Sequence, residues 1–107
     1  MIEEMVKFRK LLNDNLVPWH DASTSRFGYT CIERTHFEWR GYQWSVINGF
    51  GSYGGYDFTN PHNQGLLELR SGAVNGGEPV GFLTADDCIA LVLGGTDWQE
   101  VANEQIH

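Results

Sequence analysis

The sequence predicts an α+β domain in which two helices pack on one face of a small, mainly antiparallel sheet of three to five strands. Apolar residues recur at helical spacing near both ends of the chain, and β-branched and aromatic residues dominate the region between them. Because the strands lie between the helices instead of alternating with them, a parallel βαβ topology is disfavoured. The 107 residues are expected to form one domain, residues 1–95, followed by an acidic tail, residues 96–107.

The first helix is expected from about Ile2 to Leu16. Its apolar residues follow one another at steps of three and four along one stripe: Ile2, Met5, Phe8, Leu12 and Leu16. Pro18 restricts Val17 to extended backbone, so the helix should stop there. Residues 19–26 are expected to form a short extended piece followed by a polar turn.

Residues 29–39 and 42–48 predict the two strands of a hairpin, joined by the two-residue turn Arg40-Gly41. In this register one face carries three pairs: Thr35 with Val46, Phe37 with Trp44, and Trp39 with Tyr42. The other face carries Arg34 with Ile47, His36 with Ser45, and Glu38 with Gln43. One face is aromatic and the other mostly polar, as a sheet packed on one side requires.

A second helix is predicted to begin after Thr84. Asp87 stands three residues later and completes a capping box, and Leu83 and Cys88 are placed to form a hydrophobic staple. An apolar stripe follows, made of Ala85, Cys88, Ile89 and Val92. Gly94 or Gly95 should end the helix in the left-handed conformation.

The remaining segments are predicted to be a short strand, Leu66–Arg70, and two glycine-rich loops, residues 49–64 and 71–81. In the tail, Trp98 and Val101 could add one or two helical turns. The predicted core draws on all the regular elements: Met5, Phe8, Leu12, Phe37, Trp44, Val46, Leu67, Leu69, Ile89 and Val92.

The net charge of −7 is concentrated in the last third of the chain. Residues 71–107 contain no Lys or Arg and six acids: Glu78, Asp86, Asp87, Asp97, Glu100 and Glu104. This balance disfavours direct nucleic-acid binding, which needs clustered basic side chains. The acids either form a solvated surface or meet a basic protein partner. In the second case Asp86, Asp87, Glu100 and Glu104 are the expected contacts.

No catalytic, cofactor-binding or metal-binding residues are predicted. Residues 49–54 match a GxGxxG pattern, but no helical periodicity follows it, as a phosphate-binding loop would require. The four histidines are scattered without ligand spacing, and His20 and Asp21 should point to opposite faces of a strand. Cys31 and Cys88 are expected to be reduced thiols. We therefore expect a protein that is not an enzyme and that has no cofactor.

The chain has no run of about 18 apolar residues that would predict a membrane span. Its first residues are charged and lack the apolar segment of a signal peptide, so a cytoplasmic location is expected.

The loop at residues 49–58 carries aromatic residues between glycines: Phe50, Tyr53, Tyr56 and Phe58. Aromatic side chains on such a loop either pack as a lid or serve as contact anchors. The sequence therefore leaves two functions open. The first is a non-catalytic protein-interaction module with a basic partner, and the alternative is a small-ligand-binding domain that uses this loop.

The order of several short motifs resembles small, uncharacterised proteins encoded by phages and prophages of gut bacteria. The motifs are Trp19-His20-Asp21, Trp44-Ser45-Val46-Ile47-Asn48-Gly49, Gly51-Ser52-Tyr53-Gly54-Gly55, Gly65-Leu66-Leu67-Glu68-Leu69 and Gly81-Phe82-Leu83-Thr84-Ala85-Asp86. The resemblance covers about residues 5–94 and implies a phage context without an activity. Inhibition of a host nucleic-acid-binding factor through the acidic last third is the interaction that this context suggests.

Overall fold

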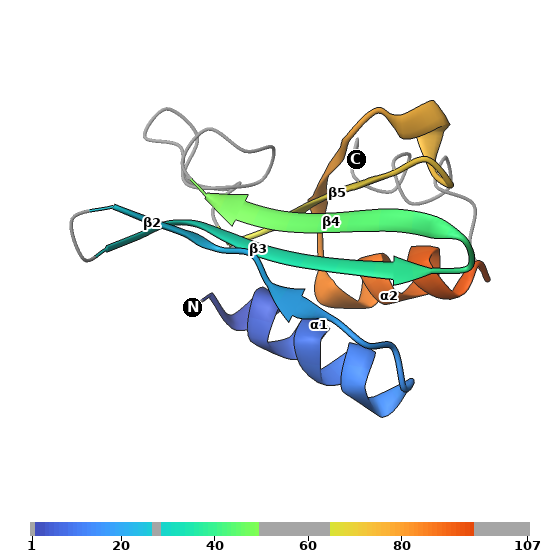
Figure 1. Cartoon of the computed structure of the whole chain (residues 1–107), viewed down its shortest axis with the longest axis horizontal. Coiled ribbons are helices and arrows are strands. Elements are labelled where there is room, and N and C mark those ends of the chain that lie inside the picture. Colours follow the sequence, from blue (N-terminus) through green and yellow to red (C-terminus); the bar gives the residue numbers. More distant parts are fainter. Residues whose placement is uncertain (1, 27–28, 50–64, 96–107) are drawn as a thin grey trace.

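The computed structural model describes residues 2–26, 29–49 and 65–95. The elements within these ranges follow the α+β order expected from the sequence, with the strands between two helices (Figure 1). They are α1 (Glu3–Asp14), β1 (His20–Asp21), β2 (Thr24–Arg26), β3 (Tyr29–Trp39), β4 (Tyr42–Gly49), β5 (Leu67–Ser71), the 3₁₀ turn η2 (Asn75–Gly77), β6 (Val80–Leu83) and α2 (Ala85–Leu93).

The sheet is antiparallel throughout these strands. It runs in the order β1-β3-β4-β5-β6, and β2 pairs with β3 further along the edge that β1 occupies. Both helices lie on the same side of the sheet and contact each other (Figure 1). The predicted fold class is therefore confirmed.

The β3–β4 hairpin has the predicted register. Phe37 pairs with Trp44 and Thr35 with Val46, and all four side chains are buried. In the turn, Arg40 has φ 54° and Gly41 has φ 80°. Two successive left-handed residues make a turn of the type that matches the twist of a hairpin.

The first helix is shorter than predicted, because it ends at Asp14 and not at Leu16. Leu16 lies in the left-handed region at φ 58° and is 85% exposed, so its assignment to the apolar stripe was wrong. The chain turns at this point: the Val17 N–H donates to the Leu12 carbonyl at 2.9 Å, and Val17 is buried before Pro18. Val17 is therefore part of the buried core, where the helical spacing predicted Leu16.

The second helix begins and ends as predicted. The Asp87 N–H donates to Thr84 Oγ1 at 3.2 Å, and the Thr84 N–H donates to Asp87 Oδ2 at 3.0 Å, which completes the capping box. At the other end Gly94 adopts the left-handed conformation at φ 79°. Leu83 and Cys88, the predicted staple, are both fully buried.

Two short strands were missed. Val80–Leu83 forms β6 where a glycine-rich loop was expected, and Thr24–Arg26 forms β2 where a polar turn was expected. Both are edge strands of four residues or fewer that depend on pairing with β5 and β3. Local sequence patterns carry little information about such pairings. The strand after residue 65 is displaced by one residue, to Leu67–Ser71.

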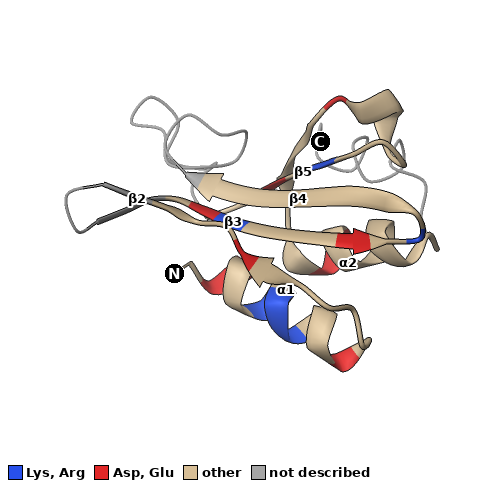
Figure 2. Ribbon diagram, in the orientation of Figure 1, with Lys and Arg blue, Asp and Glu red and all other residues tan. Residues whose placement is uncertain are grey.

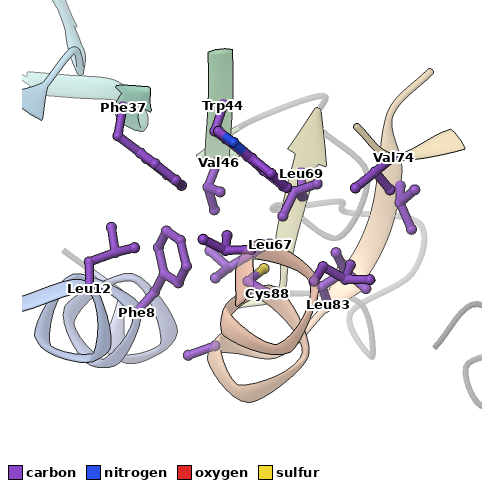
Figure 3. Packing of buried hydrophobic residues seen from close by; sticks show 14 of the residues in the cluster. Phe8, Leu12, Phe37, Trp44, Val46, Leu67, Leu69, Val74, Leu83 and Cys88 are labelled. Carbon is purple, nitrogen blue, oxygen red and sulfur yellow. The ribbon is translucent and has the colours of Figure 1, made fainter. Parts of the chain in front are cut away.

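The core lies between the two helices and the sheet (Figure 3). Phe8 and Leu12 on α1 face Phe37 on β3, and the Phe8 and Phe37 ring centroids are 6.0 Å apart. Nine of the ten predicted core residues are buried there: Met5, Phe8, Leu12, Phe37, Trp44, Val46, Leu67, Leu69 and Val92. Ile89 was predicted wrongly, because it is only partly buried and packs against the edge of the cluster.

A buried arginine joins α1 to the sheet. Arg9 Nε donates to Thr35 Oγ1 at 2.7 Å, and Arg9 Nη2 donates to Asp21 Oδ1 at 3.2 Å and to the Arg34 carbonyl at 3.1 Å. The guanidinium also lies 4.7 Å from the centre of the Trp19 ring. These contacts connect α1, β1 and β3 on the apolar side of the sheet.

Candidate functional site

The face of the sheet opposite the two helices carries the polar half of the strand residues. We call it the polar face. Residues that pair across antiparallel strands share a face. The register therefore places on it the residues that alternate with the buried ones: His20, Arg34, His36, Glu38, Gln43, Ser45, Ile47, Glu68 and Arg70. None of these side chains belongs to the core cluster.

One row of side chains crosses the polar face. His20 on β1 pairs with His36 on β3, His36 pairs with Ser45 on β4, and Ser45 pairs with Arg70 on β5. The four residues come from four different strands. The row offers two imidazoles, a hydroxyl and a guanidinium, all of which can donate hydrogen bonds.

A hollow of about 380 Å³ lies along this row. Its lining includes His36, Gln43, Ser45 and Arg70, with Gly72 and Gly77 at one end. Its described lining residues include one that is permanently charged, Arg70, and no carboxylate. The volume is at the lower end of the range of small-molecule sites in proteins.

The Arg70 side chain is held at the side of the hollow by the turn that follows β5. Arg70 Nε donates to the Gly77 carbonyl at 3.0 Å. Gly77 has φ 93°, which favours glycine, and its N–H donates to the Val74 carbonyl at 3.0 Å. The guanidinium is exposed, and its two terminal nitrogens have no acceptor within the described part of the chain.

The two histidines of the row contact each other. The ring centroids of His20 and His36 are 5.7 Å apart, and the rings are perpendicular. Partial burial lowers the pKa of His36, and the neighbouring charges of Arg34 and His20 lower it further. A neutral His36 donates through one ring nitrogen and accepts through the other at pH 7.

The sequence interpretation missed this pair, since 16 positions separate the two histidines. The sequence offers one indication of this pairing. Phe27-Gly28 separates a polar run from a β-branched run, as Arg40-Gly41 separates the two predicted strands, and such a two-residue link is typical of a hairpin turn. A regular hairpin folded at that point would pair residue 20 with residue 35, and the register shift between Thr24 and Ser25 moves the partner of His20 to His36. Residues 27 and 28 themselves lie outside the described ranges.

A second hollow of similar size, about 380 Å³, lies beside the first and shares Gln43 with it. Its lining includes His20, Trp19 and the carboxylate of Glu38. Glu38 Oε2 accepts a hydrogen bond of 3.2 Å from Gln43 Nε2. The two hollows therefore differ in charge, because the first contains an arginine and the second a glutamate.

The predicted acidic contacts on α2 have internal roles. Asp87 is part of the capping box, and Asp86 Oδ2 lies 2.8 Å from Lys7 Nζ on α1. The hydrogen bond and charge of Asp86 raise the pKa of Lys7. Glu4 Oε2 accepts from the Ala85 N–H at 2.8 Å, so the starts of the two helices are joined. Figure 2 shows acidic residues near the start of both helices and basic residues on α1.

Five of the predicted contacts lie outside the described residues. They are the aromatic residues of the loop and the two acids of the tail: Phe50, Tyr53, Tyr56, Glu100 and Glu104. Residues 50–54 of the GxGxxG match and the predicted helical turns of the tail also fall outside. Of the predicted site residues, the structure thus describes Asp86 and Asp87.

The structure does not bring His20, Asp21 and Cys88 together into one reactive site. His20 is on the polar face and Asp21 on the apolar side, as predicted from their adjacency in a strand. Hydrogen bonds from Ser23, followed by Arg9, lower the pKa of Asp21 to about 2. Cys88 is fully buried, and burial raises the pKa of its thiol well above the usual value. Among the described residues no group of three or more His, Cys, Asp or Glu is arranged to hold a metal ion.

Comparison with known proteins yields no match among family models, curated proteins or solved structures. The resemblance to phage-encoded proteins therefore stays a prediction. No helix in the described ranges has the length and apolar character needed to cross a membrane.

Proposed function

We propose that this chain is a non-catalytic binding module that holds its ligand against the polar face of the sheet. The observation that carries the proposal is the hollow along the row His36, Ser45 and Arg70. The sequence alone ranks a protein partner above a small ligand. The size of the hollow and its convergent hydrogen-bonding groups favour the small ligand, at this face rather than at the loop of residues 49–58.

We include no catalytic role in this proposal because of where the reactive groups among the described residues lie. A thiol nucleophile must be accessible and ionised, and Cys88 is neither. A carboxylate often orients a histidine base, but within the described residues no hydrogen bond joins His20 or His36 to one, and Asp21 lies on the other side of the sheet and binds Arg9. The groups that line the hollow are donors and acceptors suited to holding a ligand.

The test is capture of small molecules from an extract of the native cells by the immobilised chain, read by mass spectrometry. Two variants add the same side chain to opposite sides of the molecule. Ser45→Arg fills the hollow, and Val6→Arg places an arginine on α1 at a position that is 55% exposed. We expect the wild type and Val6→Arg to retain the same molecule and Ser45→Arg to lose it.

Thermal unfolding of each variant accompanies the capture. Gln43→Arg, at an exposed position of the same hollow, repeats the test if Ser45→Arg lowers the melting temperature. Retention of the same molecule by both hollow variants contradicts the proposal, since the binding surface then lies elsewhere.

A second candidate function is the interaction with a basic protein, such as a host nucleic-acid-binding factor. The observation that favours it is the exposure of Asp86, whose side chain remains 67% exposed beside Lys7. The capping box holds the start of α2 rigid, so this carboxylate has a fixed position. Association driven by such charges weakens steeply as salt is added.

Two variants distinguish direct contact between Asp86 and a basic partner from an effect of losing the Lys7–Asp86 ion pair. Asp86→Asn removes the carboxylate, while Lys7→Gln breaks the same ion pair and leaves the carboxylate in place. A basic partner should bind Asp86→Asn more weakly, and should bind Lys7→Gln at least as well as the wild type. Equal binding of the wild type and both variants would exclude Asp86 as a contact. Glu100→Gln with Glu104→Gln tests the tail in the same assay.

A further inference from the structure

We infer that the hollow on the polar face binds a small anion whose carboxylate or phosphate group meets Arg70. The inference rests on the proposed function and names the chemical class of its ligand. It follows from three features of the site: the position of the guanidinium, the hydrogen-bonding groups around it, and the absence of acids among the described residues of the lining.

The guanidinium is oriented before a ligand arrives. Its Nε is bonded to the Gly77 carbonyl at 3.0 Å, which fixes one edge of the planar group. The two terminal nitrogens form no hydrogen bond within residues 2–26, 29–49 and 65–95. They form the pair of parallel donors that carboxylates and phosphates accept in a two-pronged contact.

Neutral donors stand next to the guanidinium along the row. Ser45 pairs directly with Arg70 across β4 and β5, and His36 pairs with Ser45. The Ser45 hydroxyl and the His36 ring nitrogens have no hydrogen-bond partner in the described part of the chain. A bound anion would accept hydrogen bonds from these groups as well as from Arg70.

The charge of the lining separates this hollow from its neighbour. The adjacent hollow contains Glu38, and Gln43 donates one of its amide hydrogens to that carboxylate. Among the described residues that line it, the hollow at Arg70 has no acid. In a chain with a net charge of −7, this lining repels an anion less than the neighbouring hollow with Glu38 does.

The experiment compares two probes of the same shape and different charge. Benzoate carries a carboxylate, and benzamide carries an uncharged amide in its place. Each is titrated into the full chain and followed by the backbone amide resonances. We expect benzoate to shift the resonances of Ser45, Arg70 and Gly77 in a saturable manner, and benzamide to bind at least about tenfold more weakly. Inorganic phosphate, titrated in parallel, shows whether the group recognised includes phosphate.

Two arginine variants show whether the effect is local. Arg70→Gln removes the charge from the hollow, and Arg34→Gln removes the same charge from the same face outside the hollow. Benzoate affinity should fall roughly tenfold or more in Arg70→Gln and change less than about twofold in Arg34→Gln. Arg70→Lys should retain part of the benzoate affinity, because lysine keeps the positive charge but lacks the two parallel N–H donors of the guanidinium.

Three results would overturn the inference: equal affinity for benzoate and benzamide, equal losses in the two glutamine variants, or no saturable shift with benzoate or phosphate. Each is distinguishable from failure of the proposed function. If the captured molecule is lost in Ser45→Arg while these anions do not bind, the polar face is still the binding surface and its ligand is not an anion.

Discussion

Arg70 on β5 donates a hydrogen bond of 3.0 Å from Nε to the carbonyl of Gly77, seven residues later in the turn that leads to β6. This bond holds the guanidinium beside Ser45 and His36 on the side of the sheet that the helices leave uncovered. The turn between β5 and β6 therefore contributes to the candidate site as well as to the sheet.

Gly77→Ala should weaken both the turn and the site. The residue has φ 93°, where a β-carbon adds roughly 1–2 kcal/mol of strain, although no atom lies within 4 Å of the added carbon. We expect a lower melting temperature and weaker benzoate binding, because the acceptor of Arg70 shifts. Gly95→Ala is the matched control, since its surroundings are equally open and its φ is not in the left-handed region. Comparable losses in both variants would argue against the role of the turn.

Arg9→Met should be the most destabilising of the variants considered. It removes the donor to Thr35 Oγ1, and it removes one of the donors to Asp21 and to the Arg34 carbonyl, which keep the N–H groups of Ser23 and Ala22. Loss of a buried charged donor typically costs about 3 kcal/mol. Denaturant unfolding should show this loss, whereas Lys10→Met, at an exposed position of the same helix, should change stability by less than about 0.5 kcal/mol. A small effect of Arg9→Met would show that the other contacts of α1 hold the helix without this arginine.

Acid should destabilise the fold partly through Asp21. Hydrogen bonds from Ser23, and then Arg9, lower its pKa from 3.8 to about 2. A carboxyl with a lowered pKa in the folded state contributes stability above its unfolded pKa and loses that contribution as the pH falls toward the folded value. The contribution of Asp21 should thus be complete above about pH 4 and disappear toward about pH 2. In Asp21→Asn the melting temperature should decline less over that interval, and an unchanged decline would assign the acid sensitivity to other groups.

The two adjacent acids of α2 should differ in their effect on stability. Asp87→Ala removes half of the capping box and should cost about 1 kcal/mol, or roughly 4 °C in melting temperature. Asp86→Ala removes an exposed ion pair with Lys7 and should cost less than about 0.5 kcal/mol. Thermal unfolding monitored by circular dichroism distinguishes the two. The reverse order would mean that the link between the helices matters more than the cap.

The sequence predicts the register of the β3–β4 hairpin and the bounds of β3, whereas β4 extends one residue further than predicted, to Gly49. Aromatic and polar side chains alternate on both strands, and a slip of one residue would move Phe37 to the face opposite Trp44 and Val46. The two-residue turn Arg40-Gly41 fixes the rest of the register. The capping box and Gly94 likewise determine the ends of α2. In each case the information is local, since the residues that specify the element lie within it or next to it.

The features that were missed depend on distant partners. β6 is a strand because β5 lies beside it, and its residues Val80–Leu83 carry no strong strand pattern of their own. Arg9 is buried because Thr35, Asp21 and the Arg34 carbonyl accept its hydrogen bonds, and its charge alone predicts exposure. The order of strands in a sheet is decided by such long-range contacts.

The candidate site was missed for the same reason. The row on the polar face exists only because β5 pairs with β4, which places Arg70 beside Ser45 across 25 positions of sequence. The sequence identified the polar face of the hairpin, with His36 and Ser45 on it, but not the arginine that completes the hollow. The acids predicted as contacts, Asp86 and Asp87, are explained in part by their structural roles in α2.

The most direct test of the central claim is a crystal structure of the full chain with benzoate. We expect the carboxylate within hydrogen-bond distance of the terminal nitrogens of Arg70 and of Ser45 Oγ, with Arg70 Nε still bonded to the Gly77 carbonyl. Benzoate bound at any other place while the hollow at Arg70 stays empty would contradict it.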